Sequence, residues 1–179
     1  MMQVPKPWMT GLLSMAAVAC APAHKQALAP EATEAQALSV TLLQPREHLY
    51  SAGQPAASDW HEIAARGVTT VVNLRPADEM QERDEASEVR AAGMRYIQIP
   101  VANGAAITPD NARKLSEAIG SANGAPVLVH CASANRAGAL LALMAAEAEG
   151  MADDAALAFG RKAGMKSTEA RVLEVLSVD

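Results

Sequence analysis

The chain has 179 residues, of which 50% are hydrophobic and only 3% aromatic, and its formal net charge is −5. This length is typical of one domain, and the apolar fraction is enough to form a hydrophobic core. The mildly acidic balance excludes a body built to bind nucleic acid. The two cysteines, Cys20 and Cys131, are too few for a disulfide scaffold or a cysteine-rich zinc module.

The N-terminus has the pattern of an export signal. Lys6 is followed by an uncharged apolar run over residues 8–19, which is too short to span a bilayer. Small residues precede Cys20, and this resembles the lipobox of bacterial lipoproteins. We therefore expect residues 1–19 to be a signal peptide and Cys20 to be the lipidation site, on the periplasmic face of a bacterial membrane. The alternatives are ordinary cleavage after an Ala-x-Ala pattern or a buried N-terminal helix.

Residues 20–45 are rich in Pro, Ala, Gln and Glu and are expected to form a flexible linker, followed by a folded domain over 46–179. In that domain, β-branched runs alternate with helical segments. Strands are expected near 48–53, 68–74, 94–99 and 126–130. Helices are expected near 55–66, 84–92, 109–121, 135–149, 153–163 and 168–176. This alternation predicts an α/β fold with a mainly parallel sheet of four or five strands, flanked by helices.

The residues that carry chemistry follow the strand over 126–130. Cys131 stands at the carboxyl end of that strand, where open α/β sheets place their sites, and a helix begins near Asn135. Backbone N–H groups of the turn and the helix start can bind an anion there. Arg136 can hold two oxygens of that anion, and His130 can orient the cysteine. The turn residues expected to line the anion site are Ala132, Ser133, Ala134 and Asn135.

Four stretches resemble the phosphatase-like domain of beta-lactamase-hydrolase-like proteins, among the cysteine-based tyrosine and dual-specificity phosphatases. They are residues 49–54, 67–76, 96–101 and 127–138. The resemblance implies a cysteine-phosphatase-like fold that needs no metal or organic cofactor. It implies that Cys131 attacks the phosphorus of a phosphomonoester and forms a phosphocysteine, while Arg136 and the loop amides hold the oxygens. Arg75, at another strand end, is a further candidate to line the pocket.

Four features depart from the phosphatase pattern. Only four residues, rather than five, separate Cys131 from Arg136. The loop glycine is replaced by Ala134, and Ala137 stands where a Ser or Thr helps the thiolate leave. Asn103 occupies the usual place of the general acid, and Asn cannot donate the proton. Asp110 is the candidate replacement, although a carboxylate at a helix start ordinarily stabilises the helix dipole.

Two other functions fit these departures. The four-residue spacing also resembles rhodanese-like sulfurtransferases, whose loop holds a persulfide on the cysteine and whose reaction needs no general acid. A catalytically weak or inactive lipoprotein that binds an anion without turnover is the second alternative. The expected partners are a phosphorylated or other small anionic substrate and, through the lipid, a membrane, with no nucleic acid.

One acidic run is interpreted as a solvated helix face rather than a metal site. It consists of Asp78, Glu79, Glu82, Asp84 and Glu85. No histidine or cysteine lies near it at a spacing typical of metal ligands. The sequence therefore predicts no metal site in this chain.

Overall fold

The computed structural model describes residues 1–3, 37–81 and 83–178. Most of the expected signal peptide, the lipidation site Cys20 and most of the expected linker therefore lie outside the described residues. Within the described part of the chain, no helix is both long and apolar enough to cross a bilayer.

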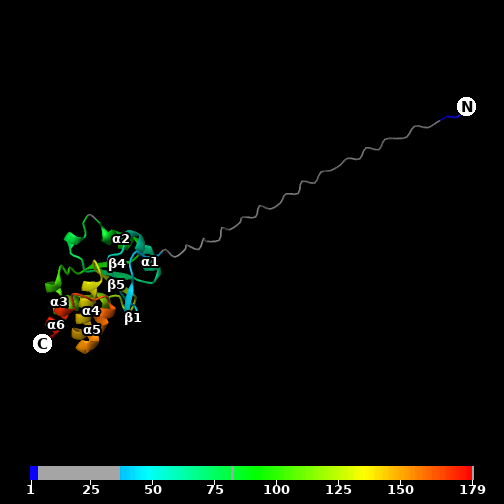
Figure 1. Cartoon of the computed structure of the whole chain (residues 1–179). Helices are drawn as coiled ribbons and strands as arrows, with labels where there is room; N and C mark the ends of the chain where they lie inside the picture. The colour runs from blue at the N-terminus through cyan, green and yellow to red at the C-terminus, as the bar shows by residue number, and fades with distance from the viewer. Residues whose placement is uncertain (4–36, 82, 179) are drawn as a thin grey trace. The chain divides into compact units, whose positions relative to one another are not determined.

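The folded unit, Ala35–Asp179, alternates strands with helices along the chain (Figure 1). The strands are β1 (Leu43–Arg46), β2 (Leu49–Ala52), β3 (Thr70–Asn73), β4 (Arg95–Gln98) and β5 (Val127–His130). The helices are α1 (Trp60–Ala65), α2 (Glu85–Ala91), α3 (Pro109–Gly120), α4 (Asn135–Glu147), α5 (Asp153–Lys162) and α6 (Glu169–Leu176). Short 3₁₀ turns occupy Ala57–Asp59, Ala77–Glu79 and Gly104–Ala106.

The five strands form one sheet in the order β1-β2-β5-β3-β4. Strand β1 is antiparallel to β2, and every other pair is parallel. Strand β5 lies at the centre, and all four of its residues are buried, as a near-continuous apolar strand requires. The α/β fold with a mainly parallel sheet is confirmed, and the last strand before Cys131 is its central one.

Successive residues of β5 face two different cores. Val127 and Val129 pack in the core that contains α3, α4, α5 and α6, whereas Leu128 packs in the core that contains α1 and α2. Figure 1 shows α3 to α6 gathered on the side of the sheet away from α1 and α2. Because side chains alternate along a strand, His130 and Cys131 point to opposite faces. Cys131 joins the first core, and the His130 ring lies 6.0 Å from the Trp60 ring in the second.

Helix α4 is buried on all sides, as its Ala- and Leu-rich sequence predicts. Its residues from Ala137 to Ala145 are all buried. Two glycines let the backbones of α4 and α5 approach closely: a Cβ on Gly138 would lie 2.2 Å from the Met165 nitrogen, and one on Gly160 would lie 2.8 Å from the Gly138 carbonyl oxygen. This close packing fixes the position of α4, whose first turn carries Arg136.

The folded unit begins earlier than the boundary expected at residue 46. Strand β1 occupies Leu43–Arg46, within the stretch assigned to the linker. Pro45 argues against a strand in the sequence, because proline cannot donate a backbone hydrogen bond. An edge strand tolerates proline, since one side of its backbone has no partner strand. The apolar residues just before β1 pack against the core beneath α1 and α2; they are Leu38, Val40 and Leu42.

Candidate active site

The loop after β5 is anchored to the end of β2. The backbone N–H of Cys131 donates to the Ala52 carbonyl at 3.4 Å, and that of Gln54 donates to the Ala132 carbonyl at 3.2 Å. Gly53 and Ser133 form an isolated antiparallel bridge beside these bonds. The Cys131 side chain is fully buried, while Ala132 and Ser133 are exposed. The loop therefore leaves the cysteine buried and turns the side chains of Ala132 and Ser133 outward.

Ala134 ends the loop in an unusual conformation. Its φ is 67°, in the left-handed region that glycine adopts most readily, and it is the N-cap residue of α4. The helix begins at the next residue, so the N–H groups of its first turn face the loop. The replacement of the loop glycine by alanine thus keeps the backbone turn, at a conformational cost.

Arg136 lies in the first turn of α4 and is held from one side. Its Nη1 donates to Glu79 Oε1 and to the Val101 carbonyl, each at 2.7 Å, and its Nη2 donates to Glu79 Oε2 at 2.6 Å. Glu79 and, more weakly, the neighbouring Cys131 thiol raise the pKa of Arg136, against the opposite effect of burial. The guanidinium is therefore a fixed cation beside the sulfur.

One edge of this guanidinium remains available to a ligand. Of its five N–H groups, two on Nη1 and one on Nη2 are used by Glu79 and Val101. The Nε–H and the second Nη2–H form the adjacent edge of the guanidinium, and among the described residues only the Cys131 thiol, Glu79 and Val101 are seen to interact with Arg136. Two parallel N–H groups on a planar edge match two oxygens of a phosphate or carboxylate.

Glu79 holds Arg136 in place, and Arg75 in turn contacts Glu79. Hydrogen bonding from Arg136 holds the pKa of Glu79 below its usual range, so this carboxyl stays ionised. The Arg75 guanidinium donates to the Glu79 carbonyl oxygen and to Gln54 Oε1, and its Nε lies 3.6 Å from Glu79 Oε2. Arg75, expected to line the pocket, thus reaches the site through Glu79 and Gln54.

His130 lies close to a buried carboxylate on the other face of the sheet. Its Nε2 lies 2.9 Å from Oε1 of Glu85, and both side chains are fully buried. Gln54 Nε2 donates to the second Glu85 oxygen. Burial opposes ionisation of Glu85, but His130, Gln54 and Arg83 outweigh it and hold its pKa below the usual range. An ionised carboxylate without exposure to water is costly unless paired, so these contacts must form together.

These contacts connect into one polar network that reaches Cys131 from both sides. Its members, in order of contact, are His130, Glu85, Gln54, Arg75, Glu79 and Arg136. His130 precedes the cysteine in the chain, and Arg136 lies beside its thiol. The network ties the end of β2, the segment after β3 and the start of α4 to the loop that holds the sulfur.

The structure corrects the interpretation of the acidic run as a solvated helix face. Asp78 and Asp84 are exposed as expected, but Glu79 pairs with Arg136 and Glu85 is buried against His130. Sequence reasoning missed both glutamates because their partners lie far along the chain. The sequence offers one local sign of their role, because both glutamates follow strand β3. Strand β3 is parallel to β5, so the two strands end side by side at the same edge of the sheet. Among the described residues, no cluster of three or more metal-ligating side chains occurs.

The Asn135 side chain serves the fold rather than a ligand. Its Oδ1 accepts from the Lys166 N–H at 2.7 Å and from Thr168 Oγ1 at 2.9 Å, and its Nδ2 donates to Ser167 Oγ at 2.9 Å. These bonds fasten the segment between α5 and α6 to the start of α4. Of the four turn residues expected to line the anion site, Asn135 can therefore contribute only its backbone.

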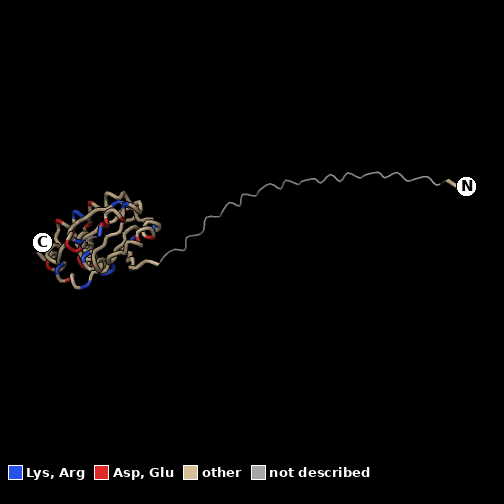
Figure 2. Tube along the Cα trace, turned by 90° about the horizontal axis from the view of Figure 1, so that it is seen from above, with Lys and Arg blue, Asp and Glu red and all other residues tan. Residues whose placement is uncertain are grey.

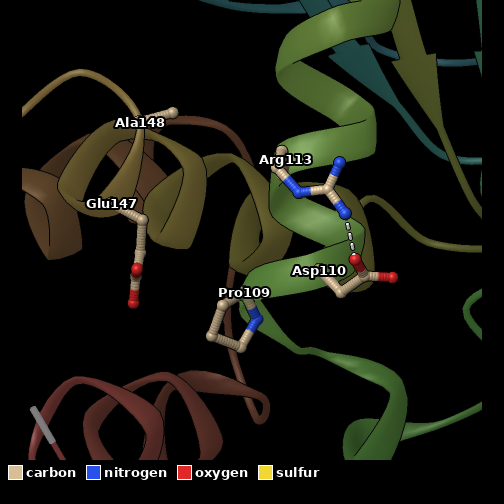
Figure 3. A pocket seen from close by; sticks show the side chains of 5 residues that line it. All are labelled: Pro109, Asp110, Arg113, Glu147 and Ala148. Atoms are coloured by element: carbon tan, nitrogen blue, oxygen red, sulfur yellow. Dashed lines mark hydrogen bonds and ion pairs between the residues drawn. The ribbon is translucent and has the colours of Figure 1, made fainter.

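Asp110, the candidate replacement for the general acid, is engaged on its own helix. Figure 3 shows its carboxylate beside Arg113, across a pocket from Glu147 and Ala148. Lys114, at 2.8 Å, and Arg113 hold the pKa of Asp110 below its usual range. A general acid must hold a proton near neutral pH, so the structure does not support Asp110 in that role.

Asn103, in the usual place of the acid, caps a turn. Its Oδ1 accepts from the Ala105 N–H at 2.9 Å, which starts the 3₁₀ turn Gly104–Ala106. It lies two residues after Val101, whose carbonyl oxygen binds Arg136. At this position the chain therefore has the amide side chain of Asn103, which cannot act as a general acid.

Comparison with known proteins shows the family of this chain. The family model for the beta-lactamase hydrolase-like protein, phosphatase-like domain, matches residues 42–148. A beta-lactamase hydrolase-like protein of Xylella fastidiosa strain Temecula1 is 37% identical over 101 residues, which are 54% of this chain. The match spans only 23% of that relative's length.

Two solved structures share the fold. Tk-PTP in its active form has a TM-score of 0.65 at 21% identity, over 76% of this chain and 94% of its own. P. aeruginosa TpbA in complex with pTyr has a TM-score of 0.54 at 20% identity, over 76% of this chain and 87% of its own. Neither comparison gives support to the rhodanese-like alternative. The chain belongs to the phosphatase-like domain family of beta-lactamase hydrolase-like proteins, with a cysteine-phosphatase-like fold.

Proposed function

We propose that this domain is a cysteine-dependent phosphatase that hydrolyses phosphomonoesters at Cys131. The observation that carries the proposal is the Nε–Nη2 edge of Arg136, which stays available beside the Cys131 thiol while Glu79 and Val101 hold the rest of the guanidinium. The family match supports the phosphatase class. In this proposal, the free edge binds two oxygens of a phosphoryl group and thereby brings its phosphorus to the Cys131 sulfur.

The reaction proceeds by two displacements at phosphorus. In the first, the Cys131 thiolate forms an S–P bond while the bond from phosphorus to the ester oxygen breaks, and the leaving oxygen takes a proton from water. In the second, water attacks phosphorus, the S–P bond breaks, and phosphate leaves. Arg136 and the N–H groups of the loop and first turn of α4 stabilise the charge that builds on the oxygens.

The lack of an acid at residue 103 determines which esters react well. A phenolate leaves without a proton far more readily than an alkoxide, so aryl phosphates are the favoured substrates. The structural relative TpbA is solved with pTyr, which is itself an aryl phosphate. We therefore propose aryl phosphomonoesters, pTyr among them, as the substrates to test first.

The test is a comparison of initial rates on an aryl phosphate between the full chain and its Cys131→Ser variant. We expect Cys131→Ser to abolish hydrolysis, because an unactivated hydroxyl cannot replace the thiolate. Ser51→Ala serves as a matched control, since Ser51 is buried in the adjacent strand and donates to the Ala163 carbonyl, away from the polar network. Equal rates for wild type and Cys131→Ser contradict the proposal.

The two alternatives give different results in the same experiment. A sulfurtransferase gains one sulfur atom on Cys131 after treatment with thiosulfate and releases no phosphate from the ester. An anion-binding protein without turnover binds phosphate in calorimetry but hydrolyses nothing. Either result removes the phosphatase proposal.

A further inference from the structure

A pocket of about 440 Å³ lies beside the loop that holds Cys131. Gly53 and Ser133 line one side of it, and these residues form the bridge that anchors the loop to β2. The end of α5 and the segment after it line the other side, with Arg161, Lys162 and Lys166. The pocket therefore borders the loop that carries Cys131, and Glu79, which contacts Arg136, is not among the residues that line it.

The pocket carries positive charge that is not neutralised within the described domain. Arg161 is paired with Glu169, with 2.8 Å between Nε and Oε2. Lys162 and Lys166 are exposed, and no described carboxylate pairs with either. Two free ammonium groups remain in a concave surface next to a hydroxyl, that of Ser133, which can also donate to an anion.

The basic side of the pocket is fixed relative to the loop. The Lys166 N–H donates to Asn135 Oδ1 at 2.7 Å, one residue before Arg136. Gly164 lies so close to the loop that a Cβ on it would be 2.7 Å from the Ala134 Cβ, and its φ is +98°. The backbone that carries the two lysines is thus held against the loop that leads to Arg136.

We propose that this pocket binds a second phosphoryl group of the substrate, so that the preferred substrate is a bisphosphorylated molecule. The inference rests on the proposed function, because it assigns the first phosphoryl group to Arg136 and Cys131. The lysines select for the second group by charge and, together with Ser133, by hydrogen bonds. Charge-assisted bonds of this kind are worth enough to raise affinity by about tenfold or more.

The test is calorimetric binding to the full chain with Cys131→Ser, which removes the nucleophile. The probes are the bisphosphates of propanediol and hexanediol and the monophosphates of the same diols. We expect at least one bisphosphate to bind about tenfold more tightly than its monophosphate. In the background of Lys162→Gln with Lys166→Gln, we expect this preference to vanish while affinity for the monophosphate changes less than about twofold. Lys114→Gln, which removes one positive charge on α3 outside the pocket lining, is the control and should keep the preference.

Three outcomes overturn the inference: no bisphosphate preference with either spacer, a preference that survives removal of both lysines, or an equal loss in Lys114→Gln. The proposed function is judged separately, by the rate of aryl phosphate hydrolysis. A lysine-dependent preference in a chain that hydrolyses nothing leaves the pocket as a bisphosphate site and removes only the catalytic proposal.

Discussion

At the residue scale, the chemistry depends on how Arg136 divides its five N–H groups. Three bind Glu79 and Val101, so the guanidinium is held in place before a ligand arrives. A lysine has a single ammonium group that can keep one of these contacts but cannot present a planar edge. Glu79 therefore acts as a positioning residue for the arginine that binds the phosphoryl group.

We expect Arg136→Lys to lower kcat/KM for an aryl phosphate by about 10²-fold or more, because one donor edge to the developing charge is lost. The measurement is the initial rate at low substrate concentration. Arg113→Lys, an exposed change on α3, is the control and should leave the rate unchanged. A similar rate for Arg136→Lys and wild type would show that the free edge of Arg136 does not bind the reacting group.

We expect Asn103→Asp to act on the leaving group. Aspartate retains the oxygen that caps Ala105, so the turn is kept, and it adds a carboxyl group that can donate a proton. The rate on an alkyl phosphate should rise by about 10²-fold, a typical effect of general acid catalysis, with a much smaller rise on an aryl phosphate. The quantity to measure is the ratio of the two rates. No change in that ratio indicates that residue 103 does not approach the leaving oxygen.

The residues of the loop could be predicted from the sequence, but their supports could not. The strand, Cys131, the turn and Arg136 are contiguous, so local pattern alone places them together. Glu79 and Glu85 stand in an acidic run that is typical of a solvated face, and only the parallel pairing of β3 with β5 brings that run to the cysteine. Asp110 was instead assigned a role that the structure does not support. Its position at the helix start is predicted correctly, but its ion pairs with Arg113 and Lys114 are not apparent from the pattern.

At the element scale, the close contact between α4 and α5 fixes the start of α4. Alternating strands and helices were predictable from apolar runs and from stop signals such as Gly67 and Gly93, which both have positive φ. Strand β1 was not, because the sequence Leu43–Arg46 contains Pro45 and its pairing with β2 depends on its edge position. The role of Gly138 and Gly160 was likewise not predictable, because it depends on how α4 and α5 pack against each other.

We expect Gly138→Ala to lower the free energy of unfolding by about 3 kcal/mol, because the added methyl meets the Met165 backbone and neither helix can yield easily. Urea unfolding of the full chain measures the change. Gly120→Ala at the end of α3 is the matched control: a Cβ there meets nothing within 4 Å, so stability should be unchanged or up to about 1 kcal/mol higher. Equal effects of the two substitutions would mean that the contact between α4 and α5 is looser than described.

At the scale of the whole molecule, acidic and basic positions are interspersed over the described domain (Figure 2). Many of the carboxylates are paired, and their partners lower the pKa values of Glu79, Glu85 and Glu88 below the usual range. In the unfolded chain these groups regain ordinary pKa values, near 4.3 for glutamate. The unfolded state then binds more protons than the folded state in acid, so the stability from these groups is present above that pH and is lost as pH falls through the folded-state values.

We expect the urea midpoint of unfolding to be lower at pH 4 than at pH 7. The Glu85→Gln variant should lose stability at pH 7 and show a smaller fall between the two pH values, since Gln cannot be protonated in this range. Glu47→Gln, at an exposed residue, is the control and should follow wild type at both pH values. A fall as steep in Glu85→Gln as in wild type would show that the buried pair with His130 does not contribute to acid sensitivity.

The most direct test of the central claim is mass spectrometry of the full chain quenched during turnover of an aryl phosphate. The account predicts the mass of one phosphoryl group on the peptide that contains Cys131, present only while substrate remains and lacking in Cys131→Ser. Steady release of phosphate without that adduct at any quench time, or an adduct on a residue other than Cys131, would contradict it.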